Sequence, residues 1–340
     1  MVLSNREQFL FGLIEQDLRM QKEFLCSQPE LYLGGTSEAQ VYPRADKFVS
    51  PDGTLNREAV RNFRNLEIFI ADIPSRHNPL GSRNADKILP QERKELLLLY
   101  KACKEVCLGG VGVLDLLRDY PCDDVGGPIL FFYNGYTFTK KWLIRVYFLL
   151  LFRHYVLPGL EENFTLMDVG GNYGYFSALI KRDNPCCSQV LLDFPEPLAL
   201  AHYYLQTHFP EAKIASYQTI AALESIDRDF ILAHDFILLP PFLYERLQTG
   251  SVDVFSGISS LGEMSREWFE YYFRSRVFSS ARYFFCMHNQ VRSSRYDTDL
   301  TILDYHLEDF KKLFFRIAPE VFPEEDVLSP YFEFIGERVR

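Results

Sequence analysis

The chain has 340 residues, of which 47% are hydrophobic and 15% aromatic, and its formal net charge is −10. Such a composition can bury a large core, in one large domain or two smaller ones. The acidic balance and the absence of a basic stripe in the sequence argue against a nucleic-acid groove, because phosphate binding needs concentrated Lys and Arg. We therefore expect no nucleic acid among the partners.

Neither a secretory nor a membrane segment is readable in the sequence. Charges at Arg6 and Glu7 interrupt the N-terminus, which lacks the apolar core of a signal peptide. The longest apolar run, Val146–Phe152, is too short to cross a bilayer. The seven cysteines are an odd number without a CxxC pair, which is typical of reduced thiols in the cytosol. We expect a cytoplasmic protein that does not bind a membrane.

Residues 1–122 predict a mainly α-helical domain with irregular connections. The segments with helical spacing of apolar residues are a first helix that ends near Gln28, then Leu55–Ile70, Gln91–Leu99 and Val106–Leu117. Asn56 is placed to cap the second of them. A helical cap or dimerisation domain is the simplest interpretation, and it allows a homodimer.

A polar loop, Asp72–Lys87, separates the second and third of these predicted helices. It contains Arg76 and His77, whose side chains could contact a polar ligand such as a sugar. A solvated connector without a binding role is the alternative, and the sequence leaves both open.

The segment Asp123–Pro128 is rich in Asp and Gly and marks the start of a second domain, residues 123–340. Asn134-Gly135 then lies between two short β-type runs, which is the strongest short-range signal for a hairpin. These runs, Ile129–Tyr133 and Tyr136–Thr139, precede an aromatic and apolar helix, Lys140–Leu157.

The stretch Phe164–Glu196 carries the main functional signal. A buried strand, Thr165–Met167, leads into Asp168 and is followed by a glycine-rich turn and an apolar helical stripe. Glycine permits positive φ and lets a ligand approach the backbone closely. A second buried strand, Gln189–Leu192, ends in Asp193, where a carboxylate can bind the two hydroxyls of a ribose. We expect a nucleoside-cofactor site on a doubly wound α/β sheet.

Two classes of cofactor use such a turn. A dinucleotide fingerprint requires G-x-G-x-x-G, whereas this turn reads G-G-x-x-G and has Asp168 two positions before its first glycine. An acidic residue there would repel a pyrophosphate, and it would attract the sulfonium or amino group of S-adenosylmethionine (SAM).

Several motifs follow one another in residues 125–295: D-V-G-G-N-Y-G at Asp168–Gly174, D-F-P-E with an aromatic helix at Asp193–Tyr204, I-L-L-P-P-F at Ile237–Phe242, S-L-G-E-M at Ser260–Met264, and an aromatic strand that ends in Asn289. Together they resemble the class I SAM-dependent methyltransferases, and within them the sugar O-methyltransferases of bacterial glycan clusters. The resemblance implies a Rossmann-like, seven-stranded α/β sheet behind the N-terminal helical domain, with SAM as cofactor. A glycine turn that only closes a strand–helix corner is the alternative.

The rest of the sheet is predicted from buried runs. We expect strands at Asp229–Leu239, Val252–Ile258 and Tyr283–Met287, helices at Leu198–Thr207, Trp268–Phe278 and Asp304–Phe315, and a final antiparallel pair at Phe315–Val321 and Tyr331–Gly336. A short strand at Lys213–Tyr217, and a loop in the first half of Asp229–Leu239, stay open.

Ligands of open α/β sheets bind beyond the carboxyl ends of the strands. On the resemblance, we assign to the cofactor site Asp168, Gly170, Gly171, Asn172, Tyr173, Gly174, Asp193, Phe194, Asp235, Phe236 and Ser259. Tyr173 would pack against the methionine part of the cofactor. Asn172 stands where a glycine is usual in this family, which leaves the backbone conformation of the turn open.

A sugar hydroxyl is a weak nucleophile, so a general base would assist the in-line methyl transfer. Glu263 and His288 follow two predicted strands and are the catalytic candidates, ahead of His234 and Asp235. In related plant O-methyltransferases a histidine stands beside the position of Glu263, and here Gly262 occupies that place. For Glu263 the alternative is a carboxylate that only stabilises a helix N-terminus, and for His288 a residue that only ends a strand.

Asn289 matches the asparagine of the family and is assigned to the acceptor site together with Arg76 and His77. No carboxylate cluster is readable, so we expect no metal. The expected function is methyl transfer from SAM to a sugar hydroxyl of a glycan, a nucleotide sugar or a glycosylated natural product, with the helical domain helping to recognise the acceptor. The alternatives are a phenol or carboxylate acceptor in a secondary metabolite, or a catalytically inactive SAM-binding scaffold.

Overall fold

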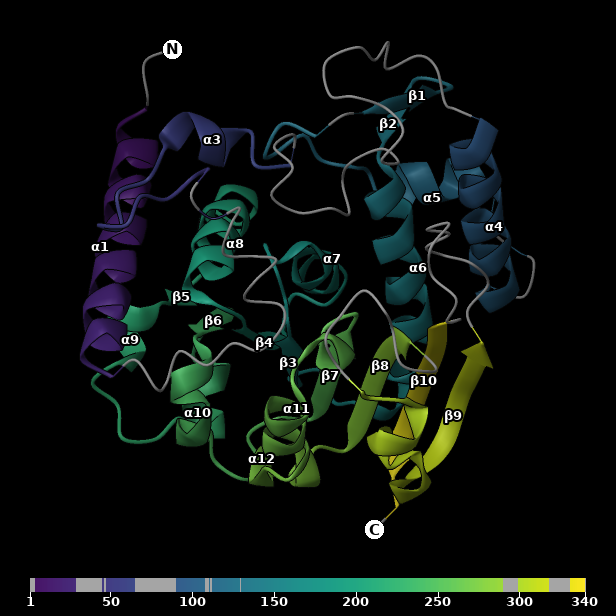
Figure 1. The fold of residues 1–340 in the computed structure, drawn as a ribbon. Coiled ribbons are helices and arrows are strands. Elements are labelled where there is room, and N and C mark those ends of the chain that lie inside the picture. The colour runs from purple at the N-terminus through teal and green to yellow at the C-terminus, as the bar shows by residue number, and fades with distance from the viewer. Residues whose placement is uncertain are drawn as a thin grey trace.

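The computed structural model describes residues 4–28, 45, 47–64, 90–107, 110, 112–128, 130–289, 299–317 and 331–339. Within these residues the chain forms an eight-stranded sheet with helices on both faces and a separate two-stranded hairpin (Figure 1). The order across the large sheet is β5-β6-β4-β3-β7-β8-β10-β9.

The strands of the large sheet are β3 (Thr165–Val169), β4 (Ser188–Leu192), β5 (Ile214–Ala215), β6 (Phe236–Leu239), β7 (Val254–Ile258), β8 (Tyr283–Asn289), β9 (Phe310–Ile317) and β10 (Tyr331–Arg338). Strands β3 to β8 are parallel, whereas β10 runs antiparallel to both β8 and β9. This confirms the predicted Rossmann-like α/β sheet with a final antiparallel pair, although the sheet has eight strands rather than seven. The additional strand is β5, in the segment for which the sequence left a strand open.

The helices form a layer on each face of the sheet. One face carries α6 (Lys140–Tyr155), α7 (Tyr175–Asp183) and α8 (Pro195–His208), with α1 (Asn5–Ser27) packed on α8 and α4 (Pro90–Val106) packed on α6. The other carries α9 (Tyr217–Ile220), α10 (Arg228–Leu232), α11 (Arg266–Phe273) and α12 (Arg276–Ser280). The remaining elements are α3 (Arg57–Arg61), α5 (Val113–Asp119), the hairpin β1 (Phe131–Tyr133) and β2 (Tyr136–Phe138), and the 3₁₀ turns η3 (Leu157–Gly159), η4 (Pro241–Arg246), η5 (Leu261–Glu263), η6 (Ile302–Tyr305) and η7 (Leu307–Asp309).

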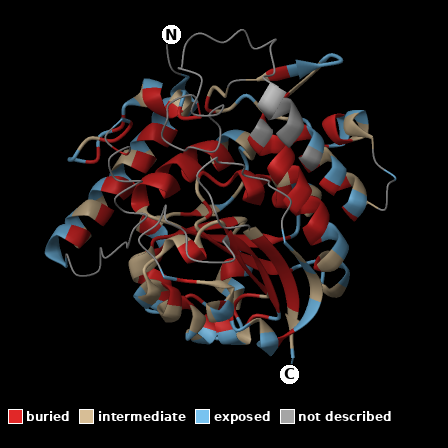
Figure 2. Cartoon of the chain, turned by 45° about the vertical axis from the view of Figure 1, so that its right-hand side comes forward, coloured by how far each residue is buried: buried red, intermediate tan, exposed pale blue. Residues whose placement is uncertain are grey.

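The central strands divide their side chains between two hydrophobic cores, because successive strand residues point to opposite faces. Leu166 and Leu191 belong to the core under α6, α7 and α8, whereas Met167 and Val190 belong to the core under α11 and α12. The central strands are buried throughout, as Figure 2 shows. By the same alternation Asp168 lies on the face of Leu166, and this orientation turns its carboxyl towards α6.

The N-terminal helices share the core that lies under α6, α7 and α8. Phe11 of α1 stacks on Tyr203 of α8, with ring centroids 5.4 Å apart. Arg64, only 2% exposed, donates to the Asp123 carboxylate at 2.7 Å, and the Tyr204 hydroxyl donates to the same carboxylate at 2.8 Å. A buried ion pair therefore lies at the predicted domain boundary, and the division into domains at residue 122 stays a prediction.

Local signals in the sequence are confirmed where a turn or cap decides the structure. The hairpin turns at Asn134 and Gly135, with φ of 47° and 83°, as an Asn-Gly turn requires. The Asn56 side chain accepts from the Ala59 amide at 3.1 Å and starts α3. That helix ends at Arg61, however, and is shorter than predicted; residues 65–70 lie outside the described part of the chain.

The prediction of a helix over Asp304–Phe315 is wrong. This segment forms the 3₁₀ turns η6 and η7, and β9 then begins at Phe310. Its aromatic and branched side chains suit a strand once a neighbouring strand is present, and β10 is that neighbour. The predicted antiparallel pair is therefore confirmed, with its first strand starting earlier than expected.

Side-chain caps explain two further differences. The first half of Asp229–Leu239 is neither strand nor loop but α10, because Asp227 accepts a backbone amide at 2.8 Å as its N-cap. The predicted helix Trp268–Phe278 is divided into α11 and α12, because Ser275 accepts an amide at 3.1 Å and starts the second helix. Both caps override an apolar periodicity that continues across them.

Candidate active site

The turn between β3 and α7 holds three residues in the left-handed region: Gly170 at φ 73°, Asn172 at φ 55° and Gly174 at φ 82°. Asparagine adopts this conformation more readily than most residues with a side chain. The Asn172 Oδ1 also accepts from the Tyr173 amide at 2.7 Å. Asn172 thus stands where the family that the sequence resembles usually has a glycine, and its backbone still adopts the left-handed conformation.

Gly170 is required for space as well as for its conformation. A Cβ at this position would lie 2.3 Å from the Cβ of Ser260, whose hydroxyl donates to the Val169 carbonyl. Ser260 follows β7, the neighbour of β3 on the side away from β4. The turn is therefore packed directly against the segment in which the catalytic candidates lie.

Asp168 lies in β3 just before the turn and is 5% exposed. Its Oδ1 accepts from the Ser256 hydroxyl at 3.1 Å. Burial raises the pKa of Asp168 to about 6, although the nearby Arg145 guanidinium and the bond from Ser256 act in the opposite direction. A cationic ligand would favour the charged form of this carboxyl, and the charged carboxylate would in turn attract that ligand.

Asp193 closes the other side of the turn. Its Oδ2 accepts from the Asn172 amide at 2.7 Å and its Oδ1 from the Phe194 amide at 2.8 Å. Burial raises the pKa of Asp193 to about 7, and the charge of Asp168 adds to the rise, although the two amide bonds lower it. Each carboxylate oxygen keeps a further lone pair, so the geometry leaves the acceptor capacity that two ribose hydroxyls need.

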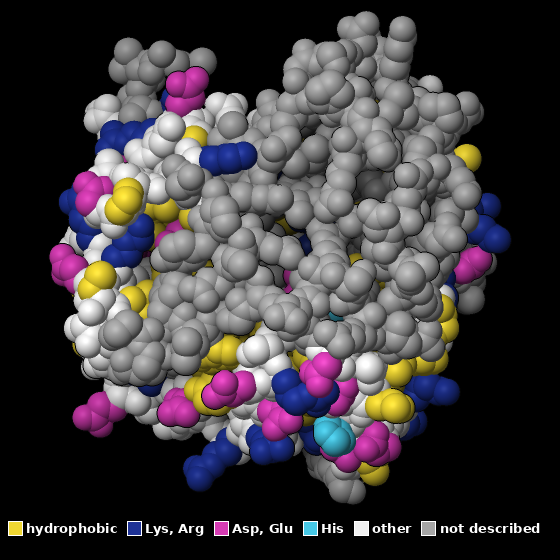
Figure 3. Space-filling model, in the orientation of Figure 1, with side chains coloured by type: hydrophobic (Ala, Val, Ile, Leu, Met, Phe, Trp, Pro, Cys, Tyr) yellow, Lys and Arg dark blue, Asp and Glu magenta, His cyan; other side chains and the backbone are white. Residues whose placement is uncertain are grey.

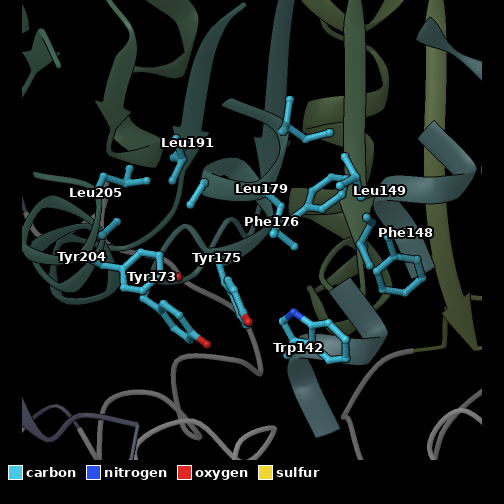
Figure 4. Close-up of a cluster of buried hydrophobic side chains, with 14 of the residues drawn as sticks. Trp142, Phe148, Leu149, Tyr173, Tyr175, Phe176, Leu179, Leu191, Tyr204 and Leu205 are labelled. Carbon is cyan, nitrogen blue, oxygen red and sulfur yellow. The ribbon is translucent and has the colours of Figure 1, made fainter. Parts of the chain in front are cut away.

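A cavity lies between the turn and α6. Its lining residues are Lys141, Arg145, Asp168, Gly170, Gly171, Asn172, Tyr173, Tyr175, Phe176 and Ile258. Figure 4 shows Tyr173 and Tyr175 side by side in this region, and their rings stack with centroids 6.0 Å apart. Most of the predicted turn residues are thus brought together around one cavity.

Lys141 and Arg145 were not singled out from the sequence. They stand four residues apart on α6, a largely aromatic and apolar helix that precedes β3. This spacing places both on one helix face. Two cationic residues on one face of a largely apolar helix are therefore the signal in the sequence that could have identified Lys141 and Arg145 as site residues.

Glu263, which follows β7, and His288, near the end of β8, lie at the same carboxyl end of the parallel strands. The Ser259 amide donates to the Met287 carbonyl at 2.9 Å, so residues 259–263 lie level with the end of β8. A Cβ on Gly262 would lie 2.2 Å from the His288 Nδ1. His288 is 3% exposed, and its ring fills the space in which a side chain at position 262 would lie.

Two more residues at this edge bear on the site. Ser259 has a φ of 59°, and its buried Oγ has no hydrogen-bond partner within the described part of the chain. Tyr305, which sequence reasoning missed, is fully buried, and its ring lies 6.2 Å from that of His288. Burial raises the pKa of Tyr305, with smaller contributions from neighbours that include Glu263. Glu263 and His288 are thus neighbours of one buried tyrosine.

Asp235 and Phe236 do not belong to the cofactor site, and their assignment is corrected. Parallel pairing sets Phe236 beside Gln189 and Leu239 beside Leu192. Asp235 and Phe236 therefore lie at the amino end of the strands, opposite the end where Asp193 lies. Asp235 pairs there with Lys181 at 2.5 Å. The sequence does not show where β6 begins, which is why its first residues were placed wrongly.

The same placement removes His234 and Asp235 from the candidates for the base. Arg76 and His77 lie outside the described residues. Of Asn289 the structure describes the backbone, which pairs with Tyr331 at the end of β8. The assignment of these three residues to the acceptor stays a prediction.

Over the residues that the structure describes, no group of three or more His, Cys, Asp or Glu side chains could hold a metal ion. No helix in the described ranges is long and apolar enough to cross a membrane. On the face drawn in Figure 3, acidic and basic side chains are intermixed along the lower part of the molecule.

No family model matches the chain, and no curated protein matches it by sequence. Among solved structures, the chain is similar to the SAM-bound magnesium protoporphyrin IX methyltransferase of Synechocystis PCC 6803, with 10% identity, a TM-score of 0.39, and 71% of this chain and 91% of that chain covered. A SAM-dependent methyltransferase of Aquifex aeolicus matches with 13% identity, a TM-score of 0.33, and 53% and 85% covered. Neither the identities nor the TM-scores are high enough to assign a function to this chain.

Proposed function

We propose that the chain is a SAM-dependent O-methyltransferase whose acceptor is a sugar hydroxyl, in a glycan, a nucleotide sugar or a glycosylated natural product. The observation that carries the proposal is the pair of carboxyls, Asp168 and Asp193, at the ends of adjacent parallel strands on either side of a left-handed turn. The choice of a sugar as acceptor is supported by the sequence motifs alone.

The residues present fit the parts of SAM. Asp168 offers a buried carboxylate to a cationic group, and Asp193 offers two oxygens to a ribose. Arg145 lines the cavity, and its buried Nε has no hydrogen-bond partner among the described residues. Buried polar atoms without partners are rare, and a polar ligand in the cavity would satisfy this one.

When bound, SAM supplies an electrophilic methyl group. The chain must then hold the acceptor hydroxyl in line and take up its proton. We assign the proton to the carboxylate of Glu263, which is partly exposed in η5 directly after β7. His288, buried against Gly262, is the rival for this role, and its burial favours a positioning role.

The test combines ligand protection with product analysis. SAM or its demethylated product should raise the melting temperature of the purified protein by mass action, and NAD should not. Mass spectrometry after incubation with SAM and a panel of sugars, nucleotide sugars and phenols should show one added methyl group on a sugar. Protection by NAD but not by SAM would refute the cofactor, and methylation of phenols alone would refute the acceptor.

A further inference from the structure

We infer that Arg145 and Lys141 of α6 bind the carboxylate at the amino-acid end of the cofactor, opposite Asp168, which binds its ammonium group. The inference rests on the proposed function and deepens it, because it assigns a subsite to two residues outside every motif of the sequence. It also names the ligand class of the cavity, a zwitterionic α-amino acid group.

The first argument is the position of the two cations. Thr139 caps α6, so Lys141 and Arg145 lie in its first two turns, on one face. Both line the cavity that Asp168 and Gly170 line from the other side. Lys141 is 4% exposed, and its ammonium nitrogen lies 5.5 Å from the centre of the Tyr173 ring, which also lines the cavity.

The second argument is the state of Arg145. Its Nε is buried and has no hydrogen-bond partner within the described part of the chain. Its guanidinium lies 5.8 Å from the centre of the Phe148 ring, and its charge reaches Asp168. A planar guanidinium matches a carboxylate with two parallel hydrogen bonds. A carboxylate in the cavity would therefore satisfy the buried nitrogen.

The third argument is the balance of charge in the cavity. A phosphate or a simple dianion would be attracted by Lys141 and Arg145 but repelled by Asp168, and a simple cation would meet the reverse. A group that carries an ammonium and a carboxylate on one carbon matches both signs at once. The methionine part of SAM is such a group.

Calorimetry with SAM and decarboxylated SAM tests the assignment directly. The two ligands share the sulfonium, the ribose, the adenine and the ammonium group, and they differ in the carboxylate. The wild-type protein should bind SAM roughly 10- to 100-fold more tightly, as expected for a charge-assisted hydrogen bond. In Arg145→Met the affinity for SAM should fall to nearly that for decarboxylated SAM, whose own affinity should hardly change, and Arg145→Lys should restore part of the difference.

The exposed Arg182 on α7 provides the matched control, since Arg182→Met removes the same charge outside the cavity and should leave both affinities unchanged. An equal loss for both ligands in Arg145→Met would place the effect at Asp168 and overturn the inference. Equal affinity of the wild-type protein for both ligands would also overturn it, while leaving the proposed function in place. If the wild-type protein binds neither ligand, the proposed function itself fails. Unfolding curves of each variant without ligand show whether it is folded.

Discussion

Asp168 is the residue at which stability and the proposed function conflict. Its pKa is raised by burial from 3.8 to about 6, so its contribution to stability is fully present below pH 3.8 and is lost as the pH rises through 6. Asp168→Asn removes this loss. We expect the variant to match the wild-type protein at about pH 3.5 and to be more stable at pH 8, by up to about 3 kcal/mol, while it binds SAM at least about 10-fold more weakly.

Urea unfolding at both pH values and calorimetry with SAM measure the two effects of Asp168→Asn. Asp229→Asn, on the exposed side of α10, is the control and should change neither. If the stability of Asp168→Asn relative to the wild-type protein is the same at pH 8 as at about pH 3.5, burial does not destabilise the charged form of this carboxyl.

Glu263 carries the prediction about catalysis. Glu263→Gln keeps the shape of the side chain but cannot take up the proton of the acceptor, so kcat should fall by about 100-fold or more while the affinity for SAM stays nearly unchanged. The acid limb of the pH–rate profile should disappear in the same variant. His288→Gln serves as the comparison, and a large loss of kcat there beside a nearly normal Glu263→Gln would transfer the role to the histidine.

At the scale of elements, the turn between β3 and α7 depends on both conformation and space. Gly170→Ala should destabilise the protein by about 2–4 kcal/mol, because the added Cβ meets a strained φ and the Cβ of Ser260 at 2.3 Å. Gly250 has nearly the same φ, 74°, with no atom within 4 Å of an added Cβ. Gly250→Ala should therefore cost only about 1 kcal/mol, and equal losses in urea unfolding would show that packing against Ser260 is unimportant.

At the scale of the whole molecule, the buried pair of Arg64 and Asp123 connects the N-terminal segment to α8, whose Tyr204 hydroxyl donates to the same carboxylate. Burial raises the pKa of Asp123, but the nearby His208 imidazole and the charge of the Arg64 guanidinium outweigh this effect, and the net shift of the pKa is downward. Arg64→Met leaves this carboxylate without its cation and should destabilise the protein by about 3–5 kcal/mol. Arg118, 61% exposed beside Asp119, is the matched control, and Arg118→Met should cost less than about 1 kcal/mol.

Unfolding in urea at pH 7 compares the two arginine variants on the same scale. Similar losses for both would contradict the view that the N-terminal segment is held by a buried charge. A second, separate transition in Arg64→Met would indicate that the segment has become an independent unit.

Features that depend on adjacent residues were readable from the chain. The Asn134-Gly135 hairpin and the glycine turn that follows Asp168 were predicted because backbone conformation at a turn is decided by the residues in it. The doubly wound α/β sheet was predicted because buried apolar runs alternate with helical segments. Asp193 was placed correctly at the carboxyl end of the parallel strands, because it directly follows a strand whose apolar run is unambiguous.

Features that depend on a distant partner were decided only in the tertiary structure. Lys141 and Arg145 reach the cavity because α6 packs beside the turn, and His288 fills the space beside Gly262 because β7 and β8 are neighbours. Asp235 lies at the wrong end of the sheet for a ligand because the register of β6 against β4 sets its position. In each case the deciding contact joins residues far apart in the chain, and no local pattern of side chains specifies such a contact.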